Sequence, residues 1–282
     1  MRDDRSAVPD HRLSSHGGET IRAAEGRLVG NGHPRPVTPP TVPSEAARYR
    51  ETRITDGSSP FVCVWNHRVG PGPQRVVPDN HADFIVSSTG LAWLVGPATS
   101  ADLPEFEPGT VLNGLRIHTA CLRPVTGVGG VELRDRKVAV DDLLPARRAR
   151  RLVELLRTAD VRPSDLHALW PDVEVDARVR EAVRLLSEGG PRGVDAVAGE
   201  VSLTPRHLRR LTERETGLSP KVIQQVGRLQ RALRLMRADG PRALADVAAS
   251  VGYADQSHLT HEVRRFTGRT PRSCLGPGAE ER

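Results

Sequence analysis

An internal repeat near the carboxyl terminus constrains the fold of this chain more than any other feature of its sequence. The segment VDAVAGEVSLTPRHLRRL, residues 194–211, aligns with LADVAASVGYADQSHLTHEV, residues 244–263. The alignment, with one residue inserted before its last pair, superposes Val197 on Val247, Ala198 on Ala248, Val201 on Val251 and Leu208 on Leu259. Such a duplication predicts that one small structural unit is built twice.

Each copy predicts a short helix, a tight turn and a second helix. In the second copy an apolar stripe at helical spacing ends at Gly252, a residue that can take a positive φ and so allow a sharp turn. Asp255 is suited to cap the next helix, as Thr204 is in the first copy, where Pro205 fits the first helical position. The pattern is that of a duplicated helix-turn-helix.

The second helix of each copy has an outward face that carries hydrogen-bond donors and lacks carboxylates. These residues are Arg206, His207, Arg209 and Arg210 in the first copy, and Ser257, His258, His261, Arg264 and Arg265 in the second. A helix fits the major groove of DNA, where arginine pairs with guanine and serine or histidine meets base edges or phosphate. A solvated basic face is the alternative, but charge combined with a duplicated helix-turn-helix favours binding of double-stranded DNA.

The segment GLSPKVIQQVGRLQRALRLM, residues 217–236, followed by LADVAASVGYADQSHLTHEVRRFTGRTP, residues 244–271, resembles the DNA-binding domain of AraC/XylS-type bacterial regulators. The resemblance covers residues 179–275. It implies two helix-turn-helix units that read successive major-groove segments on one face of DNA, and RNA polymerase as a further partner. It also implies that Arg206, Arg209, Arg210, Ser257, His258 and His261 face the bases. This chain departs from the family at Ser202, the usual turn glycine, at Thr212 and Val263, usually phenylalanine, and at His261, where arginine is common.

A long helix is predicted between the two units. Ser219 can cap it, Pro220 can begin it, and the run Asp239-Gly240-Pro241 ends it. About eighteen residues span roughly 27 Å, which approaches the ~34 Å turn of the duplex once the two units are added. Four arginines recur every third residue along it and are expected to face solvent or phosphate: Arg228, Arg231, Arg234 and Arg237.

The positive charge of the chain is concentrated in the predicted DNA-binding domain. Residues 176–275 hold 18 Lys and Arg against 11 Asp and Glu, a balance of +7, and the remainder holds 23 against 24. No apolar run approaches the ~18 residues of a membrane span, and no apolar secretory core begins the chain, so we expect a cytoplasmic protein. Cys63, Cys121 and Cys274 are too few and too far apart to suggest a disulfide framework or a thiolate zinc site.

Short apolar runs broken by glycine and proline dominate residues 46–142. The runs FVCVWNHRV, QRVVP, ADFIVSS, LAWLVG and TVLNGLRIH predict strands of a sandwich or small barrel. The segment resembles the cupin-like β-barrel that precedes many AraC-type domains, where it senses a ligand or mediates dimerisation. The fold class is therefore expected to be α+β, with a β-barrel over residues 46–142, a helical connector over 143–175 and the all-α DNA-binding domain over 176–275.

Within the predicted barrel, Trp65, Trp93, Arg116 and His118 are candidates for an effector pocket. Both tryptophans lie mid-strand, and Arg116 and His118 are two residues apart and therefore on one strand face, where they could orient an anion. Core packing is the alternative role of the tryptophans. His67, His81 and His118, with Asp79 or Asp83, have metal-binding chemistry but lack the close spacing of paired ligands, so no metal or other cofactor is expected.

The remaining segments complete the expected organisation. Residues 1–45 and 276–282 are predicted to be disordered tails. Residues 145–160 predict an amphipathic helix and 166–170 a further short one. The resemblance to AraC-type regulators implies that these connector helices form a homodimer seam. The leading hypothesis is a transcription regulator and not an enzyme. The alternatives are a cupin-type metal-dependent enzyme or a DNA-repair alkyl transferase fused to the same domain, and an architectural DNA-binding protein with an inert barrel.

Overall fold

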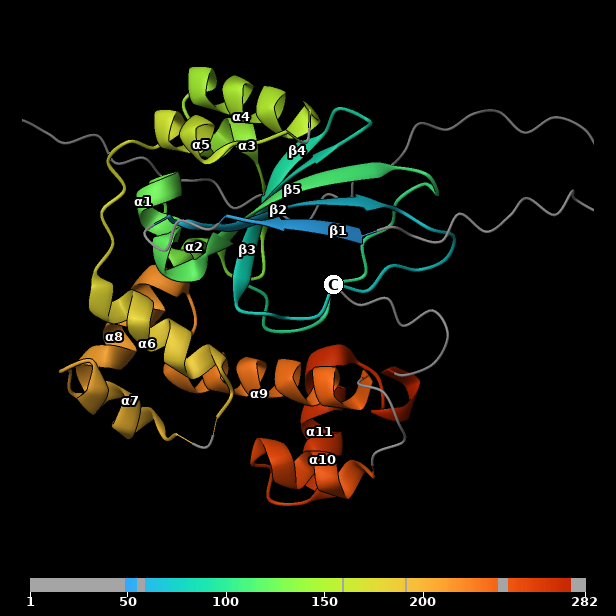
Figure 1. The fold of residues 1–282 in the computed structure, drawn as a ribbon, viewed down its shortest axis with the longest axis vertical. Coiled ribbons are helices and arrows are strands. Elements are labelled where there is room, and N and C mark those ends of the chain that lie inside the picture. Colours follow the sequence, from blue (N-terminus) through green and yellow to red (C-terminus); the bar gives the residue numbers. More distant parts are fainter. Residues whose placement is uncertain (1–48, 55–58, 159, 191, 238–242, 275–282) are drawn as a thin grey trace, which may run out of the picture. The chain divides into compact units, whose positions relative to one another are not determined.

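Antiparallel strands in the first half of the chain form one sheet. The computed structural model describes residues 49–54, 59–158, 160–190, 192–237 and 243–274. Within them the sheet contains β1 (Tyr49–Arg53), β2 (Phe61–Arg68), β3 (His81–Ser87), β4 (Ala92–Val95), β5 (Val111–His118) and β6 (Lys137–Ala139). The strands are hydrogen-bonded in the order β1-β2-β5-β3-β4-β6, so β5 lies between β2 and β3 (Figure 1).

Both faces of the central strands are buried, which explains why their sequences are almost continuously apolar. On one face Val64, Leu115 and Ile117 belong to the main core of the sheet. On the other face Trp65 packs with a smaller cluster, and Gly114 of the neighbouring strand leaves space for its ring. A Cβ atom at Gly114 would lie 2.0 Å from Cε2 of Trp65, so this position accepts only glycine without rearrangement.

The expected β-barrel is an open sheet as far as the described strands go. The hydrogen-bonded order ends at β1 and β6, and no pairing between these two edges is present in the described residues. All residues of β1 are exposed and β6 has only 3 residues, which is why neither strand carried an apolar signal in the sequence. The run QRVVP, predicted as a strand, is not one of the named strands, because Pro73 and Pro78 flank it, and it contributes an isolated bridge between Val76 and Asp102.

A group of short helices follows the sheet. They are the 3₁₀ helix η1 (Thr119–Cys121), α1 (Leu122–Thr126), α2 (Gly130–Leu133), α3 (Val140–Leu143), α4 (Ala146–Thr158) and α5 (Pro163–Leu169). The amphipathic helix predicted over residues 145–160 is confirmed as α4, which buries Leu152 and Leu156 in the main core of the sheet. The helix predicted over residues 166–170 is α5, which begins earlier because Pro163 occupies its first turn.

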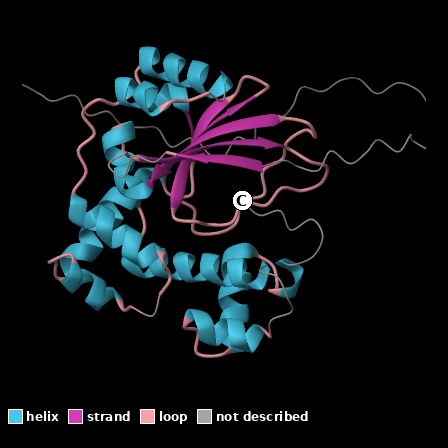
Figure 2. Ribbon diagram, in the orientation of Figure 1, coloured by secondary structure: helices cyan, strands magenta, loops and turns pink. Residues whose placement is uncertain are grey.

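The second half of the described chain is helical, which confirms the α+β class (Figure 2). Its elements are α6 (Ala177–Ser187), α7 (Val194–Glu200), α8 (Pro205–Thr216), α9 (Pro220–Arg237), α10 (Leu244–Val251), α11 (Gln256–Thr267) and the 3₁₀ helix η2 (Arg272–Cys274). The long helix α9 joins two apolar cores: Ile223 packs with α6, α7 and α8, whereas Leu229 and Leu233 pack with α10 and α11. The predicted eighteen-residue joining helix is thus confirmed by the 18 residues of α9.

The predicted tails at residues 1–45 and 276–282 lie outside the described residues. Among the helices that are described, none has the length and apolar character needed to cross a bilayer.

Candidate nucleic-acid interface and ligand cavity

The two predicted repeats are built in the same way. Thr204 caps α8 by accepting a hydrogen bond from the backbone N of His207 at 3.2 Å, and Asp255 caps α11 by accepting one from the backbone N of His258 at 2.7 Å. Each turn is closed by an equivalent backbone bond, from Leu203 N to Ala198 O in the first unit and from Tyr253 N to Ala248 O in the second. The caps and turns are those the sequence predicted.

The repeat extends past the aligned segment to the carboxyl ends of α8 and α11. The hydroxyl groups of Thr216 and Thr267 are buried, and each donates to the carbonyl oxygen four residues earlier at 2.7 Å. Each also accepts a hydrogen bond, at 3.0 Å, from the backbone N two residues later, across Gly217 or Gly268 in the left-handed conformation. A Thr-Gly pair therefore ends both helices in an identical manner.

The two turns differ at one equivalent position. Gly252 has φ +81°, and Ser202, which replaces the turn glycine in the first unit, has φ +55°. The serine thus keeps the left-handed backbone of the turn and bears a steric cost that glycine does not.

The outward faces of α8 and α11 carry the predicted DNA-binding residues at the surface. The exposed members are Arg206, Arg209, Arg210, Ser257, His258, His261, Arg264 and Arg265, and His207 is half-buried. Arg209 is engaged by Glu213 of the same helix, with Nε and Oε1 2.8 Å apart. Arg206 and Arg210 have no ion-pair partner among the described residues and so remain available to an incoming acceptor.

The second unit contains a buried carboxylate that the sequence reading did not single out. Glu262 is 3% exposed, and its Oε1 accepts a hydrogen bond from Nε2 of Gln225 on α9 at 2.8 Å. The same oxygen lies 4.0 Å from Nε2 of His258. Burial, and then the charge of Glu262, raise the pKa of the neighbouring Tyr253 hydroxyl. An acidic residue four positions after a histidine on a helix is the signal that would have pointed to this pair.

The four arginines that recur every third residue along α9 do not all have the same role. Arg228 donates from Nη1 to the carbonyl oxygen of Gly252 at 3.2 Å, and its guanidinium lies 5.1 Å from the centroid of the Tyr253 ring. Arg228 therefore contacts the turn of the second unit and does not face solvent alone, contrary to our expectation for this position. Arg234 is exposed, as predicted, and Arg231 is half-buried.

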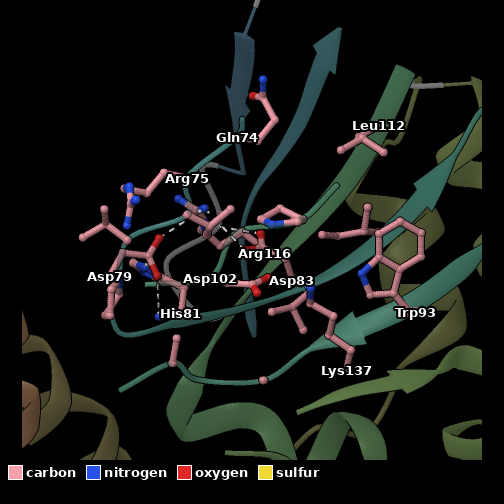
Figure 3. Close-up of a pocket in the computed structure, with 18 of the residues that line it drawn as sticks. Gln74, Arg75, Asp79, His81, Asp83, Trp93, Asp102, Leu112, Arg116 and Lys137 are labelled. Atoms are coloured by element: carbon pink, nitrogen blue, oxygen red, sulfur yellow. Dashed lines mark hydrogen bonds and ion pairs between the residues drawn. The ribbon is translucent and has the colours of Figure 1, made fainter. Parts of the chain in front are cut away.

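A cavity lies on the side of the sheet that carries Trp65. Trp65, Trp93 and Arg116 line it, together with Asp79, Asp83, Asp102, Lys137 and the segment from Gln74 to Pro78 (Figure 3). His118, the fourth predicted pocket residue, is not among the lining residues. Its Nδ1 instead accepts a hydrogen bond from the backbone N of Ala120 at 3.3 Å and caps η1.

Arg116 is neutralised by two carboxylates within the cavity wall. Its Nε lies 3.2 Å from Asp83 Oδ1, and its Nη2 lies 3.2 Å from Asp79 Oδ2. Burial alone would raise the pKa of Asp79, but the charges of Arg116 and His81 outweigh it and hold that pKa below its usual value. The same two carboxylates outweigh the burial of Arg116 and raise its pKa further. The anion-orienting pair of Arg116 and His118 that we expected is therefore not formed.

The remaining candidates for site chemistry are the metal-binding side chains and the cysteines. No group of three or more His, Cys, Asp or Glu in the described part of the chain is placed to hold a metal ion. Cys63, Cys121 and Cys274 are buried, and burial raises the pKa of the Cys63 thiol to about 12 and that of Cys121 to about 11. A protonated thiol is a poor nucleophile, which disfavours the alkyl-transferase alternative at both residues.

Residues around the sheet hold the carboxyl ends of both α8 and α11. Nη1 of Arg134 donates to the carbonyl oxygen of Gly217 at 3.2 Å. The backbones of α2 and α8 also approach closely, because a Cβ atom at Gly130 would lie 2.2 Å from the nitrogen of Gly217. At the end of α11, Nη1 of Arg75 donates to Thr267 O at 2.5 Å and the backbone N of Ala101 donates to Phe266 O at 2.8 Å. No short-range sequence pattern marks these long-range contacts.

Residues 197–275 match the model of a protein family described as a helix-turn-helix domain. The chain is 32% identical over 93 residues to the bifunctional transcriptional activator and DNA repair enzyme Ada of Escherichia coli, a match covering 33% of this chain and 26% of Ada. It is 31% identical over 103 residues to the HTH-type transcriptional activator RhaS of Escherichia fergusonii, covering 36% of this chain and 37% of RhaS. A solved AraC-type transcriptional regulator from Chromobacterium violaceum is 25% identical, with a TM-score of 0.33, over 35% of this chain and 88% of that one.

The chain therefore spans between 26% and 37% of the length of these two curated relatives. The family model begins within α7 and ends just after η2, so it covers most of the first repeat, all of the second and the helix that joins them. Residues 197–275 of this chain are a helix-turn-helix domain.

Proposed function

We propose that the protein is a sequence-specific transcription regulator that binds double-stranded DNA through α8 and α11. The observation that carries the proposal is the pair of equivalent units whose outward faces expose basic side chains. In this proposal α8 and α11 enter successive segments of the major groove on one side of the duplex, with α9 setting their separation. Arginine–phosphate contacts supply most of the affinity, which therefore falls steeply with salt concentration.

Specificity is assigned to the residues that face the bases. Arg210 is the strongest candidate in α8, because it is exposed and unpaired among the described residues whereas Arg209 is engaged by Glu213. An unpaired guanidinium can form a bidentate pair with guanine O6 and N7. In α11 the corresponding residues are Ser257, His258 and His261, with Arg264 and Arg265 as phosphate contacts.

The experiment is selection of bound sequences from random DNA, followed by affinity measurements on the selected duplex and on a random one. Arg210→Ala should relax the preference at one base pair and cost about 1–3 kcal/mol there. Arg231→Ala is the matched control on α9, and it should weaken both duplexes equally or have no effect. Equal losses on the two duplexes for Arg210→Ala would contradict the assignment.

The cavity on the sheet is assigned as the effector site, and residues in or next to its wall contact the carboxyl end of the DNA-binding helix α11. Arg75 lines the cavity and also binds the last turn of α11. Asp102 lines it too, next to Ala101, which bonds to Phe266 at the same helix end. A ligand that displaces either loop changes the support of α11, so effector binding and DNA affinity are coupled. Repeating the DNA selection with and without cell metabolites tests this coupling.

Two partners and a location follow from the family resemblance. The connector helices α4 and α5 are assigned as the seam of a homodimer, and RNA polymerase as the partner at a promoter, in the cytoplasm where the DNA lies. A monomer mass by light scattering at micromolar concentration would overturn the dimer.

A further inference from the structure

The cavity wall combines flat aromatic surfaces with aliphatic side chains. The rings of Trp93 and Phe106 are stacked, with centroids 6.1 Å apart and an interplanar angle of 24°. Trp65, Ile85 and Leu112 complete the apolar part of the lining. The cavity is small, about 70 Å³. A planar ring can stack against such walls.

The charged groups of the lining compensate one another. Three carboxylates, Asp79, Asp83 and Asp102, face three cations, Arg75, Arg116 and Lys137. Lys137 Nζ lies 2.6 Å from Asp102 Oδ2, and Arg116 lies 3.2 Å from each of its two carboxylates. The cluster around Arg116 holds one carboxylate more than its guanidinium can neutralise, so an entering anion would be repelled there.

The hydrogen-bonding groups of the lining are not all satisfied. Nε of Arg75 is buried and has no partner among the described residues, although its Nη1 is bonded to Thr267 O. Both oxygens of Asp83 are occupied, Oδ1 by Trp65 Nε1 at 2.7 Å and Oδ2 by Arg116 Nη2 at 3.4 Å. An entering cation would therefore find both oxygens of Asp83 taken, whereas a ligand oxygen or ring nitrogen could satisfy the buried donor of Arg75.

We propose that the cavity binds an uncharged, planar aromatic molecule that presents one hydrogen-bond acceptor, such as a carbonyl oxygen, to Nε of Arg75. This inference rests on the assignment of the cavity as the effector site and adds the chemical class of the effector. The ligand ring lies among Trp65, Trp93 and Phe106. Its acceptor then shares one guanidinium with the last turn of α11, which connects the occupied cavity to the DNA-binding helix.

Four probes of similar size and different polarity test the proposal on the full chain in the absence of DNA. Benzamide is neutral with an acceptor, toluene is neutral without one, benzoate is an anion and benzylammonium is a cation. Binding is followed by calorimetry and by the fluorescence of the tryptophans. Benzamide is expected to bind at least about tenfold more tightly than the other three, the effect of one hydrogen bond to a charged donor.

Two variants locate the binding. Arg75→Met keeps the length of the side chain and removes its donors, so it should lower benzamide affinity about tenfold and leave toluene affinity unchanged. Gln74→Met is the matched control at the neighbouring lining residue and should change neither. Thermal unfolding of each variant verifies that it is folded.

Three outcomes overturn the proposed ligand class: benzoate or benzylammonium binding as tightly as benzamide, no probe binding at millimolar concentration, or folded Arg75→Met binding benzamide normally. None of these outcomes affects DNA binding by the unliganded protein. Conversely, a chain that takes up benzamide but selects no DNA sequence would contradict the proposed regulator while the ligand assignment stands.

Discussion

His258 and Glu262 are neighbours on one face of α11, with Nε2 of the imidazole 4.0 Å from Oε1 of the buried carboxylate. Nδ1 of His258 accepts a hydrogen bond from the backbone N of Ala254 at 3.4 Å, so the ring proton lies on Nε2, which faces Glu262. The ring edge also meets Tyr253, with centroids 5.2 Å apart. A residue predicted to read bases is therefore held in one orientation by the protein.

Glu262→Gln should alter the DNA preference of the second unit alone. The amide keeps the shape of the side chain and can still accept from Gln225, but it removes the negative charge that orients Nε2–H of His258. We expect the base preference read by α11 to change by about threefold to tenfold, within the range of one altered hydrogen bond. Sequence selection with the variant measures this directly.

The first unit supplies the internal control for this variant. Leu211 occupies the position in α8 that Glu262 occupies in α11, so no equivalent charge exists there. The bases read by α8 should therefore be selected as before. Unchanged preferences at both half-sites would show that Glu262 does not position His258.

Ser202→Gly should stabilise the protein. The serine is exposed and has φ +55°, a conformation that costs a side-chain-bearing residue roughly 1–2 kcal/mol, and glycine removes this cost while adding some chain entropy to the unfolded state. The net gain is expected to be about 0.5–1 kcal/mol in the free energy of unfolding. Urea denaturation measures it, and Gly252→Ser in the second unit should have the opposite sign. A destabilised Ser202→Gly protein would contradict this account of the turn.

Local signals predicted the helical half of the chain well, because its elements are specified by neighbouring residues. The caps Thr204 and Asp255, the turn at Gly252 and the length of α9 follow from spacing alone. The sheet was predicted where its strands are apolar runs, as in β2, β4 and β5. The exposed strand β1 has no apolar periodicity, so nothing in its sequence distinguishes it from a loop.

The ligand cavity could be predicted only in part, because loops distant in sequence build it. Trp65, Trp93 and Arg116 were found because they lie on strands that the apolar pattern revealed. Arg75 and Asp102 lie in loops, and the bridge between Val76 and Asp102 that brings these loops together is a tertiary contact. His118 shares a strand face with Arg116, but it lies at the strand end, where its ring caps η1.

Arg134→Met should loosen the end of α8 with little loss of global stability. The Arg134 side chain is 48% exposed, and its bond to Gly217 O protects only one carbonyl group, so the free energy of unfolding should fall by about 1 kcal/mol or less. Amide hydrogen exchange in the last turn of α8 should become faster, because that turn opens locally. Arg136→Met, two residues away, is the matched control, and equal exchange in the two variants would exclude this role for Arg134.

Acidification should weaken the contact between the sheet and the DNA-binding helices through His118. Burial, and then the positive charges near it on His81 and Arg180, lower the pKa of His118 from 6.5 to about 4. The folded state therefore favours the neutral ring, whose Nδ1 caps η1, and Ala120 of η1 packs in the same core as Leu208 and Leu211 of α8. Protonation removes the acceptor and breaks this cap.

The sign of the pH effect follows from a folded pKa below the unfolded one. The contribution of neutral His118 to the free energy of unfolding is fully present above pH 6.5 and is lost as the pH falls towards about 4. This contribution has a maximum of about 3 kcal/mol. The Asp79 carboxyl, whose pKa is also lowered, loses its contribution only at more acidic pH. Denaturation of the native chain and of His118→Asn between pH 7 and pH 4 separates this residue from the others, because asparagine keeps a capping acceptor and does not titrate. A variant that loses stability over this range as steeply as the native chain would place the pH dependence on other groups.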